Sequence, residues 1–92
     1  MVSSSIRVEC RGPLPPAESV AGAVWGHAGI VLSPPSENWE RLVVGSSKDE
    51  SARVEVEPVL HDPLVLEVKS PDHQSAHTAA LFIAMETYGR FM

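Results

Sequence analysis

Two histidines four residues apart are the first feature of the sequence that could do chemistry. They begin and end the stretch HQSAH, from His73 to His77, which has the spacing of the zinc-binding pattern H-E-x-x-H. In that pattern a glutamate in the second position acts as general base toward metal-bound water. Position 74 is a glutamine, which cannot take the proton, and the third histidine of the extended pattern would fall at position 83, an isoleucine. The sequence therefore predicts no zinc-peptidase activity.

A metal site without peptidase activity is a less specific interpretation of the same residues. His61 lies in the loop before the strand that leads into the helix of His73 and His77, so three imidazoles could converge on one metal ion. Histidines one turn apart on an exposed helix also arise by chance. We therefore expect neither a bound metal nor another cofactor, and keep these three histidines as the only weak candidates for ligands.

Other catalytic patterns are missing from the sequence. It contains no G-x-S-x-G elbow, no S-x-x-K pair and no glycine-rich phosphate loop. Cys10 ends the alternating stretch SIRVEC, which predicts a buried strand residue rather than a reactive thiol. The sequence thus favours a protein that is not an enzyme, with a small metal-dependent or thiol-dependent enzyme as the third alternative.

The two clearest strands are ARVEVEPVL and PLVLEVKS, in which apolar and charged residues alternate. A three-residue loop over 61–63 would pair them as a hairpin whose inward residues face each other. This register sets Glu55 opposite Lys69 and Glu57 opposite Glu67. It also sets Val56 opposite Val68 and Pro58 opposite Leu66. The like-charged pair indicates that a basic group lies nearby, unless both carboxylates turn into water.

These carboxylates give the main functional prediction, an acidic sheet face that binds another protein, of basic character. The predicted contact residues are Glu55, Glu57, Glu67, Lys69 and Trp39. An inhibitor of the immunity or antitoxin type would fit this description by size and charge alone. Trp39 could also be a core residue, because a chain with five aromatic residues needs their bulk inside.

Length and composition restrict the number of domains, the type of partner and the expected location. A chain of 92 residues with 43% hydrophobic and 21% charged residues forms one domain, covering 1–92. Its net charge of −5 and its lack of Lys/Arg clusters disfavour nucleic acid as a partner. No apolar run approaches the roughly 20 residues of a membrane span, and no signal peptide is evident, so the expected location is cytoplasmic.

The elements follow from periodicity and from proline and glycine. Strands are predicted over 5–11 and in AGIVLSPP, and a short helix over 16–25 if Gly22 is tolerated. The stretch 36–45 suits either a helix or a strand, with strand preferred. A helix is predicted over 71–88, capped by Ser70 and closed by Gly89. The expected fold is α+β, with a four- or five-stranded, mainly antiparallel sheet and a C-terminal helix packed on one face.

The segment AALFIAM, within this last helix, is apolar on every side. A helix with that pattern is buried on more than one face, and a small sheet covers only one of them. We therefore expect Leu81, Met85 and Tyr88 to meet either the N-terminal helix or a second chain. A self-assembling structural subunit, a homo-oligomer held by this helix, is the second alternative for function.

Overall fold

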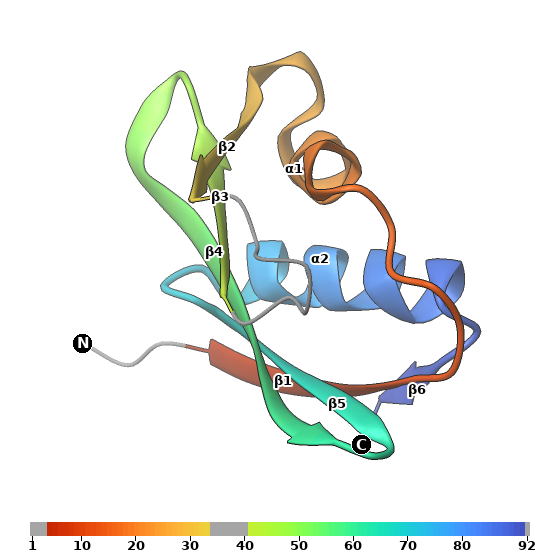
Figure 1. The fold of residues 1–92 in the computed structure, drawn as a ribbon. Helices are drawn as coiled ribbons and strands as arrows, with labels where there is room; N and C mark the ends of the chain where they lie inside the picture. The colour runs from red at the N-terminus through yellow and green to blue at the C-terminus, as the bar shows by residue number, and fades with distance from the viewer. Residues whose placement is uncertain (1–3, 34–40, 92) are drawn as a thin grey trace.

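The computed structural model describes residues 4–33 and 41–91 as an α+β domain with a six-stranded, wholly antiparallel sheet (Figure 1). The strand order is β2-β3-β4-β5-β1-β6. The elements are β1 (Ser4–Cys10), α1 (Ala17–Trp25), the short 3-10 turn η1 (Gly26–Ala28), β2 (Gly29–Ser33), β3 (Leu42–Ser46), β4 (Asp49–His61), β5 (Leu64–Ser70), α2 (His73–Glu86) and β6 (Arg90–Phe91). None of the described helices has the length and apolar character needed to cross a membrane.

The expected fold is confirmed in its class and corrected in its strand number. The two predicted helices correspond to α1 and α2, and the four predicted strands correspond to β1, β2, β4 and β5. The described part of 36–45 contributes to β3. The sheet has six strands rather than four or five, and the two-residue β6 lies beyond the reach of any periodicity pattern. Trp39 lies outside the described residues.

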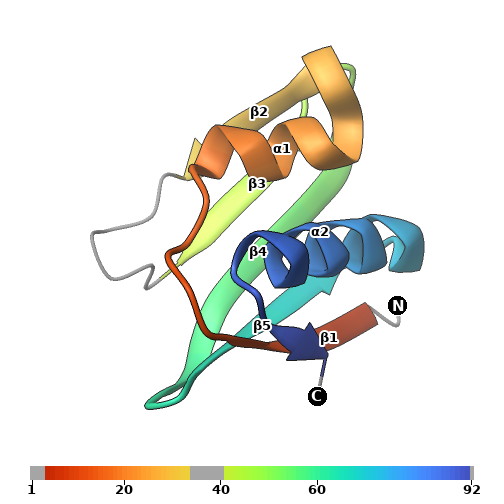
Figure 2. The same ribbon diagram turned by 90° about the vertical axis from the view of Figure 1, so that its right-hand side faces the viewer.

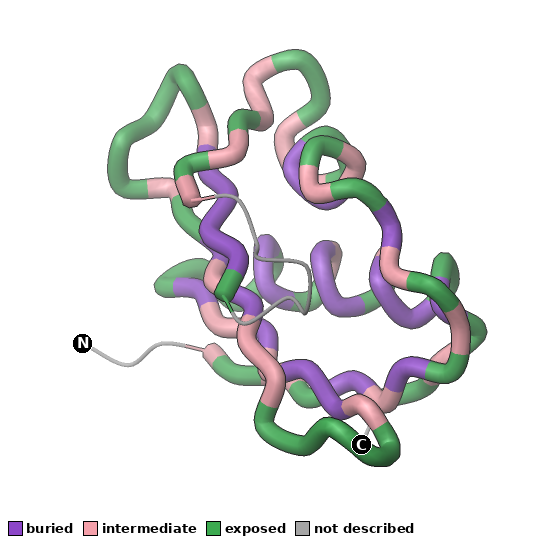
Figure 3. Tube along the Cα trace, viewed as in Figure 1, coloured by how far each residue is buried: buried purple, intermediate pink, exposed green. Residues whose placement is uncertain are grey.

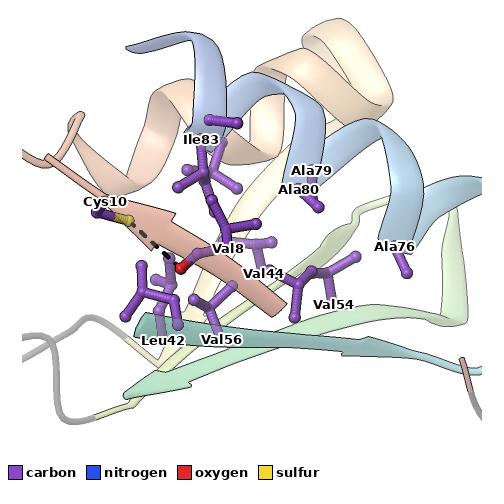
Figure 4. Close-up of a cluster of buried hydrophobic side chains, with 14 of the residues drawn as sticks. Val8, Cys10, Leu42, Val44, Val54, Val56, Ala76, Ala79, Ala80 and Ile83 are labelled. Carbon is purple, nitrogen blue, oxygen red and sulfur yellow. Dashed lines mark hydrogen bonds between the residues drawn. The ribbon is translucent and has the colours of Figure 1, made fainter. Parts of the chain in front are cut away.

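Both helices cover the same face of the sheet (Figure 2), with α1 over β2 and β3 and α2 over β5 and β1. Burial alternates along β1 and the middle of β4, whereas residues 42–45 of β3 are buried on both faces (Figure 3). The core joins the inward strand residues to a small-residue side of α2 (Figure 4). Its fully buried members include Val8, Leu42, Val44, Val54, Val56, Leu66 and Val68 from the sheet, Ala76, Ala79, Ala80 and Ile83 from α2, and Val20 and Ala21 from α1. The alanines let α2 lie close to the strands, so a core with few aromatic side chains still fills its volume.

The predicted register of β4 with β5 is confirmed at four positions. Glu55 faces Lys69 and Glu57 faces Glu67. Val56 faces Val68, and Pro58 faces Leu66. The predicted three-residue loop is wrong, because His61 pairs with Leu64 and only two residues turn the chain. A register shift between Pro58 and Leu60 supplies the extra residue instead, so a bulge preserves the pairing parity.

The residue that caps the N-terminus of α2 is not the one predicted. Asp72, not Ser70, accepts hydrogen bonds from the backbone N–H groups of Gln74 and Ser75. The Ser75 hydroxyl donates to Asp72 Oδ2 at 2.7 Å, and this bond is the main reason that the pKa of Asp72 lies below its ordinary value. Ser70 is buried and donates its hydroxyl to the Arg53 carbonyl oxygen at 2.7 Å. The serine thus ties the end of β5 to β4 rather than capping the helix.

The end of α2 is closed by a Schellman-type bond from the Gly89 N–H to the Ala84 carbonyl, 2.8 Å long. The left-handed position of this motif is held by Tyr88, with φ 54°, and not by the glycine. Gly89 is required for a different reason, since a Cβ there would overlap the Glu9 carbonyl oxygen of β1. The sequence identified the right glycine but the wrong physical role.

This close approach gives a paired prediction. Gly89→Ala should destabilise the domain by more than about 1 kcal/mol, because β6 must move away from β1 to make room. Gly22→Ala is the matched control, since Gly22 is exposed in α1 and a Cβ there meets nothing within 4 Å. It should stabilise the domain by about 0.5–1 kcal/mol through helix propensity. Urea unfolding measures both, and equal shifts would contradict the assigned role of Gly89.

Candidate functional site

The three candidate metal ligands do not come together. The rings of His73 and His77 lie side by side on α2, with centroids 6.3 Å apart. His61 ends β4 at the opposite end of β5, a strand of seven residues that spans about 20 Å. Over residues 4–33 and 41–91, no group of three or more His, Cys, Asp or Glu side chains is placed to hold a metal ion.

The two histidines of α2 make other contacts. His77 packs edge-on against Phe91 of β6, with ring centroids 5.7 Å apart. His73 Nδ1 lies 3.2 Å from the hydroxyl of Ser4 in β1. Both side chains therefore connect the helix to the edge of the sheet that β1 and β6 form.

Cys10 is buried on the inward face of β1, as the alternating pattern predicts. Its thiol lies 3.9 Å from the Val8 carbonyl oxygen (Figure 4). Desolvation by burial raises the pKa of Cys10, and a hydrogen bond with Thr87 opposes this only in part. The thiolate form that a nucleophilic cysteine needs is thus disfavoured at neutral pH.

The predicted acidic residues lie on the face of the sheet that the described helices leave uncovered, here called the open face. Alternation places Glu55 and Glu57 of β4 on this side, and Glu67 of β5 directly opposite Glu57. The Lys69 ammonium lies 2.6 Å from a Glu57 oxygen and 3.7 Å from a Glu67 oxygen. The basic group expected beside the like-charged pair is therefore part of this chain.

The remaining carboxylates of the open face are paired as well. Arg41 donates to Glu55 at 2.7 Å, although Lys69 is the cross-strand neighbour of Glu55. Arg7 lies 3.3 Å from Glu67. Glu9 of β1 lies 3.4 Å from Arg11 and 3.6 Å from Arg90. Glu9, Glu55, Glu57 and Glu67 thus each have at least one basic neighbour.

The expectation of an acidic face needs correction. Six described basic side chains lie on or beside the open face, against four carboxylates, a balance of +2 on a chain whose net charge is −5. The basic set is Arg7, Arg11, Arg41, Arg53, Lys69 and Arg90, and the acidic set is Glu9, Glu55, Glu57 and Glu67. Alternation within β4 and β5 predicts that the acids lie on this side, but it does not show that the arginines of other strands share it.

A second surface lies on the opposite side of β6, where α2 ends. We call it the C-terminal apolar strip: Leu81, Met85, Tyr88 and Phe91, with exposed fractions of 45%, 69%, 82% and 40%. A groove of about 280 Å³ is lined by three of them, Leu81, Met85 and Phe91, together with Ala84, Gly89 and Arg90. The expected cover from the N-terminal helix is not found, because α1 packs on another side of α2 and leaves the strip exposed. Phe91 is the member that sequence reasoning missed.

Tyr88 combines the greatest exposure of the four with an unfavourable backbone. Its φ of 54° is a left-handed conformation that costs a bulky residue about 1–2 kcal/mol. Glycine or asparagine normally holds this position. Strain of this kind at an exposed aromatic residue points to a role outside the stability of the fold.

Comparison with known proteins found no matching family model, no matching curated protein and no matching solved structure.

The ion pairs of the open face predict a pH dependence. The hydrogen bond from Lys69 lowers the pKa of Glu57, so the ionised carboxylate stabilises the folded state. That contribution is fully present above about pH 4.3, the ordinary glutamate value, and is lost as the pH falls through the depressed pKa. Glu57→Gln should therefore be less stable than the wild type at about pH 7, and this difference should shrink at about pH 3.

Urea unfolding at the two pH values checks this expectation. Glu50→Gln is the matched control, because Glu50 is exposed and makes no ion pair within the described part of the chain. Identical pH profiles for the two variants would contradict a stabilising role for the Lys69–Glu57 pair.

Proposed function

We propose that this chain is a non-enzymatic protein-binding module and that its contact surface is the C-terminal apolar strip. The observation that carries the proposal is the gathering of four large, exposed apolar side chains at the end of α2 and on β6. Leu81, Met85 and Phe91 line one groove, and Tyr88, in a strained conformation, directly follows the helix end. Contiguous apolar surface of this kind marks interaction sites in small domains.

The energetics support the strip over the open face as the centre of a contact. A large apolar side chain contributes about 1.5–3 kcal/mol when it passes from full exposure to burial. Tyrosine also loses little conformational entropy on binding, which is why it anchors interfaces. The paired charges of the open face, in contrast, must lose their water before they can lie at the centre of an interface, and this desolvation offsets much of their attraction.

The partner proposed here is a different protein chain, and an inhibitor role of the immunity or antitoxin type stays a prediction. Two copies of this chain each carry a net charge of −5, which opposes their association. Self-association through the strip, which also follows from its apolar character, is the alternative that the first experiment below separates.

Met85 is the residue to test, because it is 69% exposed at the middle of the strip. Met85→Glu should change the free energy of unfolding by less than about 0.5 kcal/mol, since an exposed side chain is replaced. It should nevertheless remove partner binding, because a partner would have to bury the new carboxylate. Val59→Glu is the matched control: Val59 is 42% exposed, on the bulge of β4, and β5 and β1 separate this strand from β6.

The measurement is photo-crosslinking in the native cell, with a benzophenone amino acid at position 85 or at position 59, together with sedimentation velocity of the purified protein. A discrete crosslinked product from position 85 alone, from a monomeric protein, supports the proposal. A product of twice the chain mass and a concentration-dependent dimer would support self-association instead. Equal products from both positions would overturn the role of the strip.

Tyr88 provides an independent prediction, in which stability and binding change in opposite directions. Tyr88→Asn should stabilise the isolated domain by about 1 kcal/mol, because asparagine tolerates the left-handed conformation. The same change should weaken capture of the product that crosslinks at position 85, because an aromatic anchor is lost. Thermal unfolding and crosslinking yield measure the two effects. A variant that is more stable and binds equally well would leave Tyr88 without a role in recognition.

A further inference from the structure

Three arginines gather at the edge of the open face, beside β6. Arg7 lies against Glu67, and Arg11 and Arg90 both lie against Glu9. We call Arg7, Arg11 and Arg90 the arginine cluster. The cluster extends over both neighbours of β1. Glu9 of β1 is paired with Arg90 of β6, and Arg7 of β1 is paired with Glu67 of β5.

The arginines of the cluster are exposed, whereas the carboxylates beneath them are largely covered. The side chains of Arg7, Arg11 and Arg90 are 58%, 62% and 67% exposed. Those of Glu9 and Glu67 are 13% and 18% exposed. A partner that approaches this edge therefore meets guanidinium groups first, although the chain as a whole is acidic.

Each of these arginines contacts its glutamate through Nε, which leaves the two terminal Nη groups at the outer end of the side chain. All three contacts are made by Nε, at 3.3 to 3.6 Å. No hydrogen bond or ion pair within residues 4–33 and 41–91 engages their terminal Nη groups, in contrast to Arg41, which uses Nη2 on Glu55. The Nη groups are part of the planar fork that binds carboxylates in a bidentate manner.

The cluster is continuous with the C-terminal apolar strip. Arg90 and Phe91 are neighbours in β6, and both line the groove of the strip. Phe91 also lines a second groove, of about 610 Å³, with Ser5, Ile6, Arg7 and Glu67. The two grooves meet at Phe91, so one bound segment can reach both the strip and the cluster.

We propose that the partner docks an acidic segment across β6, with apolar side chains in the strip and Asp or Glu carboxylates on the Nη groups of the arginine cluster. This inference rests on the proposed function and adds the chemistry of the partner. The proposal is based on charge complementarity. The proposed partner segment is acidic, whereas the acidic residues of the sequence predict a basic partner. The carboxylates displace water and not the internal glutamates, which keep their Nε contacts.

The test uses the full chain and three synthetic peptides of about ten residues. One alternates glutamate with leucine or phenylalanine, one has glutamine for each glutamate, and one has lysine. Binding is measured by NMR chemical-shift perturbation at about 20 mM and about 300 mM salt. The glutamate peptide should bind at least about tenfold more tightly than the glutamine peptide at low salt, should lose this advantage at high salt, and should shift signals of β1 and β6.

Two double variants separate the cluster from net charge. Arg7→Gln with Arg11→Gln should lower affinity for the glutamate peptide about tenfold. Lys48→Gln with Arg53→Gln changes the net charge equally but lies outside the cluster, and should change affinity less than about twofold. Thermal unfolding of each variant confirms that it is folded. Equal losses in the two variants would overturn the proposal.

Further outcomes also decide against it. Equal binding of the glutamate and glutamine peptides, no binding of any peptide, or tighter binding of a single-stranded oligonucleotide would each overturn recognition of an acidic segment. The strip proposal is judged separately: if position 85 still crosslinks to a discrete partner while the peptides fail, the protein-binding function stands and only the inferred chemistry of its partner falls.

Discussion

The antiparallel pairing of β4 with β5 is the constraint on which the other surfaces of this domain depend. Alternation in this pair sends Val56 and Val68 toward the helices and Glu57 and Lys69 away from them. A slip of one residue would turn the charged set into the core, where each unpaired charge costs several kcal/mol. The bulge between Pro58 and Leu60 prevents that slip while the chain turns in two residues. Because β3 and β1 pair with the outer edges of these strands, their faces are fixed by the same register.

The features that could be predicted from sequence are those that alternation and periodicity decide locally. The register of the hairpin, the burial of Cys10 and the two helices are of this kind. Those that could not be predicted depend on contacts between distant segments. The Lys69 ammonium reaches diagonally to Glu57 because Arg41 already occupies Glu55, and no pattern within β4 and β5 contains that information. Gly89 is needed because of a carbonyl of β1, about eighty positions earlier in the chain, and β6 is too short to give a periodic signal.

A two-layer architecture leaves one side of the sheet without a helix, and here charged side chains provide the cover. Val43 and Val65 lie on that side, yet they are only 7% and 2% exposed. Long arginine, lysine and glutamate side chains can shield apolar groups with their aliphatic stems while the charged ends stay in water. The ion pairs of the open face therefore also keep the sheet from presenting a second apolar surface. Large exposed apolar side chains are left on the edge strand β2, at the hairpin end of β4 and on the strip.

The position of β1 in the sheet has a consequence for how the chain reaches its native state. β1 comes first in sequence but lies between β5 and β6, and its Arg7 faces Glu67, sixty residues later. Closing a loop of that length costs roughly 3–4 kcal/mol of chain entropy before the pairing returns any stability. During synthesis β1 must wait for both neighbours to leave the ribosome, while the β2–β5 meander can already pair locally. Until β1 docks, β5 is an open edge strand, and that interval is when the nascent chain is most exposed to pairing with the wrong molecule.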